Sequence, residues 1–345
     1  MSVLAFCNPL IDATVEVNSD YLKKWNLRND DAILADEKYQ PLVDEVVNNP
    51  NVYMTGGGSC QNSLVMAQWM MQDQGTTAIV GAVGPDANTD VLKGIMNKAG
   101  VKTIYQTIPD QFTGCGVILV CDNNRSIVAS VAASGHFNFE KWDTPEVVDA
   151  VRNAKVILVS TYFLRSSDKT GLAIAAECAY RNIPLAITLS SPSAIESEAW
   201  PALKQLYRVA SIIFGNTTEM VCMGKQLNIL GADATEENTD IKELTKKLAN
   251  WDNPAHKRVV VTTMGAEPTI ACESGSEVVV REIIQIEASK IVDTNGAGDS
   301  FAGGFLAYYI RGAPLAKCID AGNYSSYFNL QQRGCAVPPT KPSFE

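Results

Sequence analysis

A glycine turn near the C-terminal end of the chain carries residue types that suit phosphoryl transfer. It reads Asp293-Thr-Asn-Gly-Ala-Gly-Asp299. An apolar, β-branched run before it, residues 278–292, predicts strand pairing, and an apolar run after it, residues 301–310, predicts a buried helix. The N–H groups at a helix start attract anions, and glycines allow a ligand to approach the backbone. The Asp299 carboxylate beside this anion site suits a base that takes a proton from a hydroxyl attacking phosphorus.

The same turn also has a purely structural interpretation. An acidic residue near a helix N-terminus after a glycine turn is common. The turn is not a Walker loop, because no Lys-Ser or Lys-Thr follows the glycines. It is not a dinucleotide fingerprint, because Phe301 stands where the third glycine should be. The turn alone therefore leaves both interpretations open.

Three other stretches place polar or glycine residues beside predicted strands and helices. Asn8 and Asp12 follow the predicted first strand, and they suit either the adjacent hydroxyls of a sugar or an Asx turn. A glycine turn, Gly56-Gly-Gly-Ser59, leads into a predicted helix that carries Asn62. The turn is either a surface against which a ligand lies or only the start of the helix. Asn216-Thr-Thr-Glu219 matches a helix capping box and also a holder of water-bound Mg²⁺.

Two single residues carry weaker signals. Arg125, at the expected tip of a hairpin, is either a surface charge or a cation that reaches a transferring phosphoryl group from a lid. Phe163 follows the predicted strand 156–160 and could stack on a base, although core packing is the commoner role of a single Phe.

The order of predicted elements indicates an α/β protein. From Pro145 onward helices alternate with short apolar strands, which predicts a doubly wound, mostly parallel sheet. The first third is richer in short strands and turns, and it is expected to supply a small sheet over the site. Ligands of such sheets bind beyond the carboxyl ends of the strands. Four candidate residues follow predicted strands: Asp12, Asn216, Gly265 and Asp299. This agreement favours the functional interpretation of the Asp299 turn.

Composition excludes several classes of protein. The 345 residues are 46% hydrophobic, enough for one large α/β domain or two smaller ones, and the net charge of −10 argues against a general nucleic-acid or membrane-surface binder. The only two histidines, His136 and His256, lie in no nucleophile motif, which disfavours hydrolase triads and excludes a His-rich metal site. The nine cysteines form no C-x-x-C pair, and neither a signal peptide nor a membrane span is evident, so we expect reduced thiols in a cytoplasmic protein.

Together these segments resemble the PfkB, or ribokinase-like, carbohydrate kinases. The stretch from Asp293 to Phe305 resembles the C-terminal signature of that family, and Gly56-Gly-Gly-Ser-Cys-Gln-Asn62 resembles its N-terminal glycine motif. Asn8-Pro-Leu-Ile-Asp12 and Asn124-Arg-Ser126 resemble the adenosine branch of the family. The resemblance runs in order from about residue 3 to the end of the sequence.

The resemblance implies one α/β kinase domain over residues 1–345, with a Rossmann-like core and a discontinuous β lid at about 12–56 and 111–133. It implies transfer of the γ-phosphate of ATP to the 5′-hydroxyl of adenosine, which gives AMP and ADP in purine salvage, with Mg²⁺ as cofactor. We expect a monomer whose partners are adenosine and ATP, and no binding to nucleic acid or membranes.

The resemblance also assigns roles to single residues. Asp299 is the base, Arg125 is the lid arginine, and Gly296, Ala297 and Gly298 form the anion hole. Asp12 holds the ribose diol, and Leu34, Ile127, Ala129 and Phe163 wall the adenine. The complete adenosine set is Asn8, Asp12, Leu34, Gly57, Gly58, Ser59, Asn62, Ile127, Ala129, Phe163 and Asn295. The ATP set is Asn216, Thr263, Gly265, Gly298 and Asn323, and Glu219 with Asn216 orders Mg²⁺ through water.

Three positions depart from the family pattern and concern nucleoside selectivity rather than the reaction. Thr188-Leu-Ser190 replaces a more usual Asn-Leu-Ser, Ser193 stands where an aromatic residue often flanks the nucleoside, and Asn323 replaces a common His near the ATP base.

Two alternatives stay open at this point. One is a kinase of another nucleoside or of a simple sugar such as ribose or fructose, although the apolar Leu34, Ile127 and Phe163 favour a substrate that carries a base. The other is a catalytically silent binding or regulatory homologue, which the intact Asp299 and its glycines disfavour.

Overall fold

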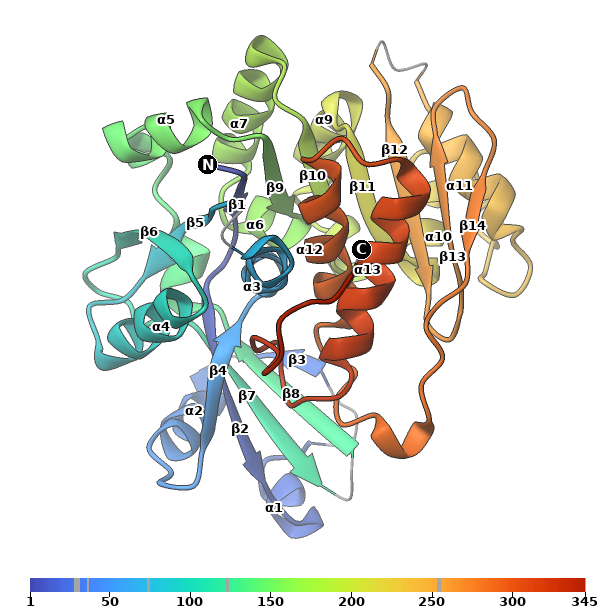
Figure 1. Cartoon of the computed structure of the whole chain (residues 1–345). Helices are drawn as coiled ribbons and strands as arrows, with labels where there is room; N and C mark the ends of the chain where they lie inside the picture. The colour runs from blue at the N-terminus through green and yellow to red at the C-terminus, as the bar shows by residue number, and fades with distance from the viewer. Residues whose placement is uncertain (28–31, 36, 73–74, 122–123, 253–255, 345) are drawn as a thin grey trace.

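The computed structural model describes residues 1–27, 32–35, 37–72, 75–121, 124–252 and 256–344 (Figure 1). At Ala32, Leu34, Glu37, Asn124 and Arg125 it describes the backbone and not the side chain.

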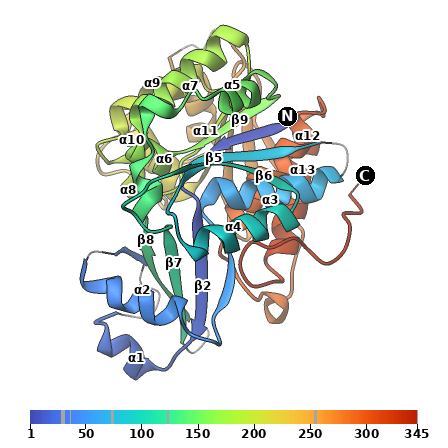
Figure 2. The same ribbon diagram turned by 90° about the vertical axis from the view of Figure 1, so that its left-hand side faces the viewer.

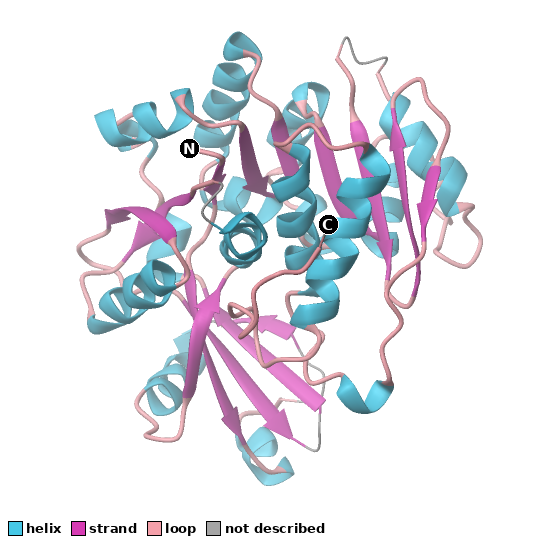
Figure 3. Ribbon diagram, viewed as in Figure 1, coloured by secondary structure: helices cyan, strands magenta, loops and turns pink. Residues whose placement is uncertain are grey.

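A nine-stranded sheet forms the centre of the molecule, in the order β14-β13-β12-β11-β10-β9-β1-β5-β6 (Figures 1 and 3). The strands from β12 to β6 run parallel, and β13 and β14 add an antiparallel edge. The parallel strands are β1 (Val3–Phe6), β5 (Thr77–Val83), β6 (Val101–Thr107), β9 (Val156–Ser160), β10 (Leu185–Thr188), β11 (Ile212–Asn216) and β12 (Val259–Met264); the edge is β13 (Glu267–Glu273) and β14 (Val279–Arg281).

Helices cover both faces of this sheet, because its central strands are apolar on both sides. Along β1, Leu4 and Phe6 face one hydrophobic core and Val3 and Ala5 face the other. The first core includes α5 (Pro145–Arg152), α7 (Asp168–Arg181), α9 (Trp200–Val209), α10 (Thr217–Gln226) and α11 (Ile241–Asn250). The second includes α3 (Ser59–Met71), α4 (Ala87–Lys98), α12 (Ala297–Tyr309) and α13 (Leu315–Asn329). The chain is therefore a doubly wound α/β protein, as the sequence predicted.

A separate five-stranded sheet, in the order β3-β8-β7-β2-β4, extends from the large one (Figure 2). Its strands come from two distant parts of the chain: β2 (Leu10–Glu16), β3 (Ala32–Leu34) and β4 (Tyr53–Gly57), then β7 (Cys115–Cys121) and β8 (Asn124–Ser130). A third hydrophobic core under it takes in α1 (Ser19–Lys24) and α2 (Gln40–Val47). The two short helices α6 (Thr161–Ser166) and α8 (Pro192–Ile195) and the 3-10 turns Glu37–Tyr39, Ala132–His136, Phe139–Lys141 and Ala288–Lys290 complete the fold.

Two local predictions are wrong. Of residues 278–292, predicted to pair as a strand, only Val279–Arg281 does so, at the exposed edge of the sheet; the remainder is loop with a 3-10 turn. Asp299 therefore does not directly follow a strand, and it lies instead in the first turn of α12. Asp12 was expected after the first strand, and it lies within β2 of the small sheet. The packing of α12 between α3 and α13, and not a strand end, thus positions the glycine turn.

All nine cysteines are buried and none forms a disulfide. No helix in the described part of the chain is long and apolar enough to cross a membrane.

A fully buried arginine joins the ends of two helices. The Arg258 guanidinium donates hydrogen bonds to the backbone oxygens of Arg208, Ala249 and Trp251, at the C-terminal ends of α9 and α11. It also lies 4.7 Å from the centre of the Tyr207 ring. A buried cation at helix C-termini is stabilised by their unpaired carbonyls and by the helix dipoles.

We expect Arg258→Lys to lower the free energy of unfolding by about 1–2 kcal/mol, because an ammonium cannot reproduce a planar fork that reaches three carbonyls and stacks on a ring. Urea denaturation measures this loss. The exposed Arg281, paired with Asp320, is the matched control, and Arg281→Lys should stay within about 0.5 kcal/mol of the parent. Equal effects of the two substitutions would contradict the helix-end role of Arg258.

Candidate active site

A cavity of about 750 Å³ lies where the carboxyl ends of the parallel strands face the small sheet. Most of the residues predicted from the sequence line it: Asn8, Asp12, Gly58, Ser59, Asn62, Ile127, Ala129, Asn216, Glu219, Thr263, Asn295, Gly296, Ala297, Gly298 and Asp299. The fold thus brings together segments that are up to about 290 residues apart in the sequence, as parallel sheets do at this edge.

The Asp299 carboxylate is held by the N-terminal turn of α3. Ser59 Oγ donates to Asp299 Oδ1 at 2.6 Å, and Asn62 Nδ2 donates to Asp299 Oδ2 at 3.0 Å. Burial raises the pKa of Asp299 above its ordinary value, and these two hydrogen bonds oppose the rise. The carboxylate is therefore fixed in orientation and has a greater affinity for a proton than an exposed aspartate.

The glycine turn before Asp299 is held in place by hydrogen bonds to Asp293 and Asn329. Asp293 accepts hydrogen bonds from the backbone N–H of Asn295 at 2.7 Å and of Gly334 at 2.8 Å, and Asn329 Nδ2 donates to the Asn295 oxygen. Gly296 has a φ of 73° and is the N-cap of α12. The Ala297 N–H, the first of α12, donates to the Thr294 oxygen at 3.3 Å. The N–H groups of Gly298 and Asp299, which follow it, have no acceptor within the helix, and Gly298 has open space where a side chain would lie. This arrangement suits an anion, and the anion site stays a prediction.

Two residues of the cavity lining carry a buried amide oxygen without a hydrogen-bond partner among the described residues, namely Asn8 Oδ1 and Asn62 Oδ1. The Asn8 amide is fixed, because its Nδ2 donates to the Ser134 oxygen at 2.8 Å and to Ser166 Oγ at 2.6 Å. A buried acceptor without a donor is costly. The cavity therefore suits a ligand that carries hydroxyl or amino donors.

Asp12 extends from β2 into the cavity between two glycines. A Cβ on Gly57 would lie 2.1 Å from Asp12 Oδ1, and a Cβ on Gly116 would lie 2.6 Å from the same atom. Burial and the negative charge of Asp299 raise the pKa of Asp12 to about 7. Gly57, predicted to touch substrate, does not line the cavity and instead leaves room for the Asp12 side chain.

Asn216 and Glu219 form a complete capping box at the start of α10. Glu219 accepts from the Asn216 backbone N–H at 2.9 Å and from Asn216 Nδ2 at 3.1 Å. Burial raises the pKa of Glu219 to about 7, and the charge of Asp299 adds to the rise. A carboxylate in this environment is stabilised by a nearby cation.

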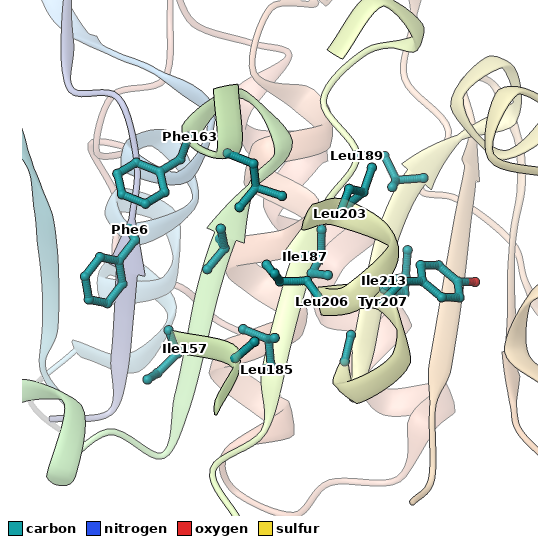
Figure 4. Packing of buried hydrophobic residues seen from close by; sticks show 14 of the residues in the cluster. Phe6, Ile157, Phe163, Leu185, Ile187, Leu189, Leu203, Leu206, Tyr207 and Ile213 are labelled. Carbon is teal, nitrogen blue, oxygen red and sulfur yellow. The ribbon is translucent and has the colours of Figure 1, made fainter. Parts of the chain in front are cut away.

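Besides Gly57, three predicted site residues that the structure describes, namely Phe163, Asn323 and Gly265, do not line the cavity. Phe163 is fully buried, and its ring centre lies 5.2 Å from that of Phe137. It also packs against Phe6, with ring centres 6.0 Å apart (Figure 4). Its prediction as a wall of the base site is wrong, because α6 directs the ring into the core. Asn323 is buried outside the cavity, where its amide accepts from Thr269 Oγ1 and donates to the Glu282 oxygen.

Gly265 lies in the turn between β12 and β13 with a φ of 63°, also outside the cavity lining. The side chains of Leu34 and Arg125 lie outside the described residues.

Several lining residues had no signal in the local sequence. Apolar side chains of the small sheet add to Ile127 and Ala129, and polar side chains gather beside α6 and α8. These residues are Leu10, Ile33, Ile118 and Val131, then Tyr162, Arg165, Ser166 and Glu198. Val131 lies directly after the end of β8. Placing these residues in the site requires knowledge of how distant segments pack.

The fold and this cavity define a sugar-kinase-like α/β protein, and residues 23–342 match the pfkB family of carbohydrate kinases. The chain belongs to this family. It is 31% identical to an adenosine kinase of Dictyostelium discoideum, over 100% of this chain and 99% of the relative.

Solved structures agree with this similarity. An Anopheles gambiae adenosine kinase in complex with P1,P4-di(adenosine-5) tetraphosphate matches with a TM-score of 0.87 and 30% identity, over 99% of this chain and 98% of that one. A Schistosoma mansoni adenosine kinase in complex with 2-fluoroadenosine matches with a TM-score of 0.84 and 26% identity, over 97% and 96% of the two chains.

Proposed function

We propose that this chain phosphorylates the 5′-hydroxyl of adenosine with ATP as donor and releases AMP and ADP. The observation that carries the proposal is the Asp299 carboxylate, held by Ser59 and Asn62 at the entrance to the α12 anion site. The full-length similarity to adenosine kinases supports adenosine as the acceptor.

In this reaction Asp299 takes the proton of the 5′-hydroxyl as its oxygen attacks phosphorus. The N–H groups of Gly296, Ala297 and Gly298 stabilise the negative charge that develops on the transferred group. Asp12 accepts hydrogen bonds from the two ribose hydroxyls. The unpaired oxygens Asn8 Oδ1 and Asn62 Oδ1 accept from further donors of the nucleoside.

The apolar wall of the small sheet supports a substrate that carries a base. Ile127 and Ala129 of β8 lie in the cavity lining, and we place the adenine against them together with Leu34. We assign residues 12–56 and 111–133 as the lid, from which Arg125 reaches the phosphoryl group. The phosphates of ATP then lie between Asn216, Thr263 and the start of α12.

The donor set fits Mg²⁺ held largely by water and phosphate. In the described ranges no group of three or more His, Cys, Asp or Glu side chains could hold a metal. Glu219 and Asn216 would hold the ion through water, in the manner usual for Mg²⁺ at nucleotide sites. When bound, Mg²⁺ neutralises charge on the β- and γ-phosphate oxygens.

We propose that the enzyme is a monomer, as the family resemblance implies. The nine unbridged cysteines support a reducing compartment such as the cytoplasm.

A coupled assay of ADP release with adenosine, inosine and ribose tests the proposed function. We expect kcat/KM for adenosine to exceed that for ribose by about 100-fold or more, because ribose cannot fill the apolar wall. Equal turnover of ribose would favour the simple-sugar kinase. If none of the three compounds causes ADP release, the result would contradict both the adenosine kinase and the ribose kinase. Adenosine binding without any turnover would favour a silent homologue.

The buried carboxylates predict the pH dependence of the reaction. Asp12 accepts hydrogen bonds as a carboxylate, and its pKa of about 7 means that this form is lost as the pH falls through 7. The raised pKa of Asp299 acts in the same direction, because a protonated base cannot take a proton. We expect kcat/KM for adenosine to fall roughly tenfold from pH 8 to pH 6. A profile that stays flat down to pH 5 would contradict this.

A further inference from the structure

The cavity has an outer wall of polar side chains to which the proposed reaction gives no role. Tyr162 and Arg165 lie three positions apart on α6, so they lie on the same side of that helix, and both line the cavity. Ser193 of α8 and Glu198, which follows that helix, line the cavity as well. All four residues are exposed. They therefore form the mouth of the cavity and not its floor.

This outer wall lies on the other side of the large sheet from the groups that hold Asp299. Helices α3 and α12, whose first turns meet at Asp299, belong to the core on one face of that sheet. Helices α6 and α8 contribute Phe163 and Ile195 to the core on the opposite face. A nucleoside with its 5′-hydroxyl at Asp299 and its ribose at Asp12 would therefore direct its base toward the outer wall.

A short hydrogen bond fixes α6 relative to the rest of the site. Ser166 Oγ accepts from Asn8 Nδ2 at 2.6 Å, and the same amide nitrogen donates to the Ser134 oxygen at 2.8 Å. Asn8 follows β1 directly, so these bonds tie α6 to the carboxyl end of a central strand. Arg165, the residue before Ser166, is thus presented to the cavity from a helix whose position is set.

Arg165 and Glu198 form an ion pair in the outer wall. Arg165 Nε donates to Glu198 Oε1 at 3.5 Å, and the two Nη groups of the guanidinium have no other acceptor among the described residues. A long, exposed ion pair contributes little to the stability of the fold. Arg165 is also the one cation among the described lining side chains, whereas Asp12, Glu219 and Asp299 are acidic like Glu198. The pair offers a ligand N–H donors beside a carboxylate acceptor.

A donor beside an acceptor matches the edge of an aminopurine. In adenine the exocyclic amino group is a donor, and the ring nitrogen next to it is an acceptor. In hypoxanthine, the base of inosine, an oxygen acceptor replaces the amino group. That oxygen would face a carboxylate, and two acceptors that face each other lack a proton to share. The base cannot shift to avoid this contact while the ribose and the 5′-hydroxyl are held at Asp12 and Asp299.

We propose that Arg165 and Glu198 determine the specificity for the base, an inference that rests on the proposed function. The Glu198 carboxylate accepts a hydrogen bond from the amino group of adenine, and the Arg165 guanidinium donates to the neighbouring ring nitrogen. Ser193 stands where an aromatic residue often flanks the nucleoside in this family, and its small side chain leaves room for the two long ones to reach the base.

Initial-rate kinetics with adenosine and inosine test the proposal. We expect kcat/KM of the parent to be roughly 100-fold higher for adenosine than for inosine. Glu198→Gln should lower this ratio at least roughly tenfold, because the amide of Gln can donate to the oxygen of hypoxanthine. The change should appear in KM more than in kcat, since the base makes the same contacts before and during phosphoryl transfer. An unchanged ratio in Glu198→Gln would overturn the proposal.

Two further variants separate base recognition from other roles. Glu177 pairs with Arg181 Nε on α7 at 2.6 Å, away from the cavity lining, so Glu177→Gln is the matched control and should keep the ratio of the parent. Arg165→Met should raise the KM for adenosine roughly tenfold and leave the KM for ATP unchanged. If Arg165→Met raised the KM for ATP instead, Arg165 would contact the phosphate donor, and its assignment to the base would be wrong.

Calorimetric titration keeps the test separate from the kinase activity. We expect the parent to bind adenosine more tightly than inosine, and Glu198→Gln to reduce the difference. If the parent shows this preference in binding but transfers no phosphoryl group, the proposed function is wrong and base recognition by the pair stands. If the parent phosphorylates adenosine and inosine with equal kcat/KM, the kinase reaction stands and base recognition by the pair is wrong.

Discussion

Replacement of Asp299 by Asn is expected to lower kcat for adenosine by about three orders of magnitude or more, with little change in adenosine affinity. The amide has nearly the volume of the carboxylate, so the cavity keeps its shape. The amide cannot take the proton of the 5′-hydroxyl. It has a single acceptor oxygen, whereas the two carboxylate oxygens of Asp299 accept from Ser59 and Asn62. Steady-state kinetics give kcat, and calorimetric titration with adenosine gives the affinity.

Asp320→Asn is the matched control, because Asp320 is a partly exposed aspartate whose partner, Arg281, lies at the edge of the sheet. We expect this variant to keep kcat within about twofold of the parent. An Asp299→Asn enzyme with unchanged kcat would remove Asp299 from the role of base. A large loss of affinity with unchanged kcat would make it a binding residue instead.

The part of the site that is local in sequence could be predicted from the sequence. The glycine turn and Asp299 are adjacent, and their chemistry depends on a helix start that their own residue types favour. The capping box of Asn216 and Glu219 is equally local. Residues 282–292 were mispredicted because a β-branched run pairs only where a partner strand exists, and β14 lies at the exposed edge of the sheet.

The part that depends on distant pairing could not be predicted. Gly116 lies beside Asp12 because β2 and β7 pair in parallel, a register that neither strand reveals alone. Helix α13 was not predicted, because the face that it packs against α12 is formed largely by small residues. A Cβ on Gly322 would lie 2.7 Å from the Phe301 ring, and a Cβ on Gly304 would lie 2.2 Å from Ser325 Oγ. Such close packing of α12 and α13 leaves little apolar periodicity in the sequence.

The packing of Gly57 against Asp12 gives the second large expected effect. We expect Gly57→Ala to raise the KM for adenosine roughly 10- to 100-fold, because the new methyl group and the Asp12 carboxylate cannot occupy the same space. The added Cβ would lie 2.1 Å from Asp12 Oδ1 and 2.3 Å from its Cγ. The backbone of Gly116 lies close to the same carboxylate, so Asp12 must leave the position from which it would bind the ribose hydroxyls. Initial rates over a range of adenosine concentrations measure the effect.

A double-mutant cycle decides whether the effect passes through Asp12. If it does, Asp12→Ala alone should raise the KM by a similar factor, and Gly57→Ala added to it should raise the KM little further, because the carboxylate that the methyl group displaces is already absent. Gly94→Ala is the control for the glycine change itself, since no atom lies within 4 Å of a Cβ placed there. It should leave the KM unchanged and slightly stabilise α4. If Gly57→Ala raises the KM by its full factor even in the Asp12→Ala background, Gly57 acts on the substrate or on the small sheet directly. The claim that Gly57 makes room for the Asp12 carboxylate would then be wrong.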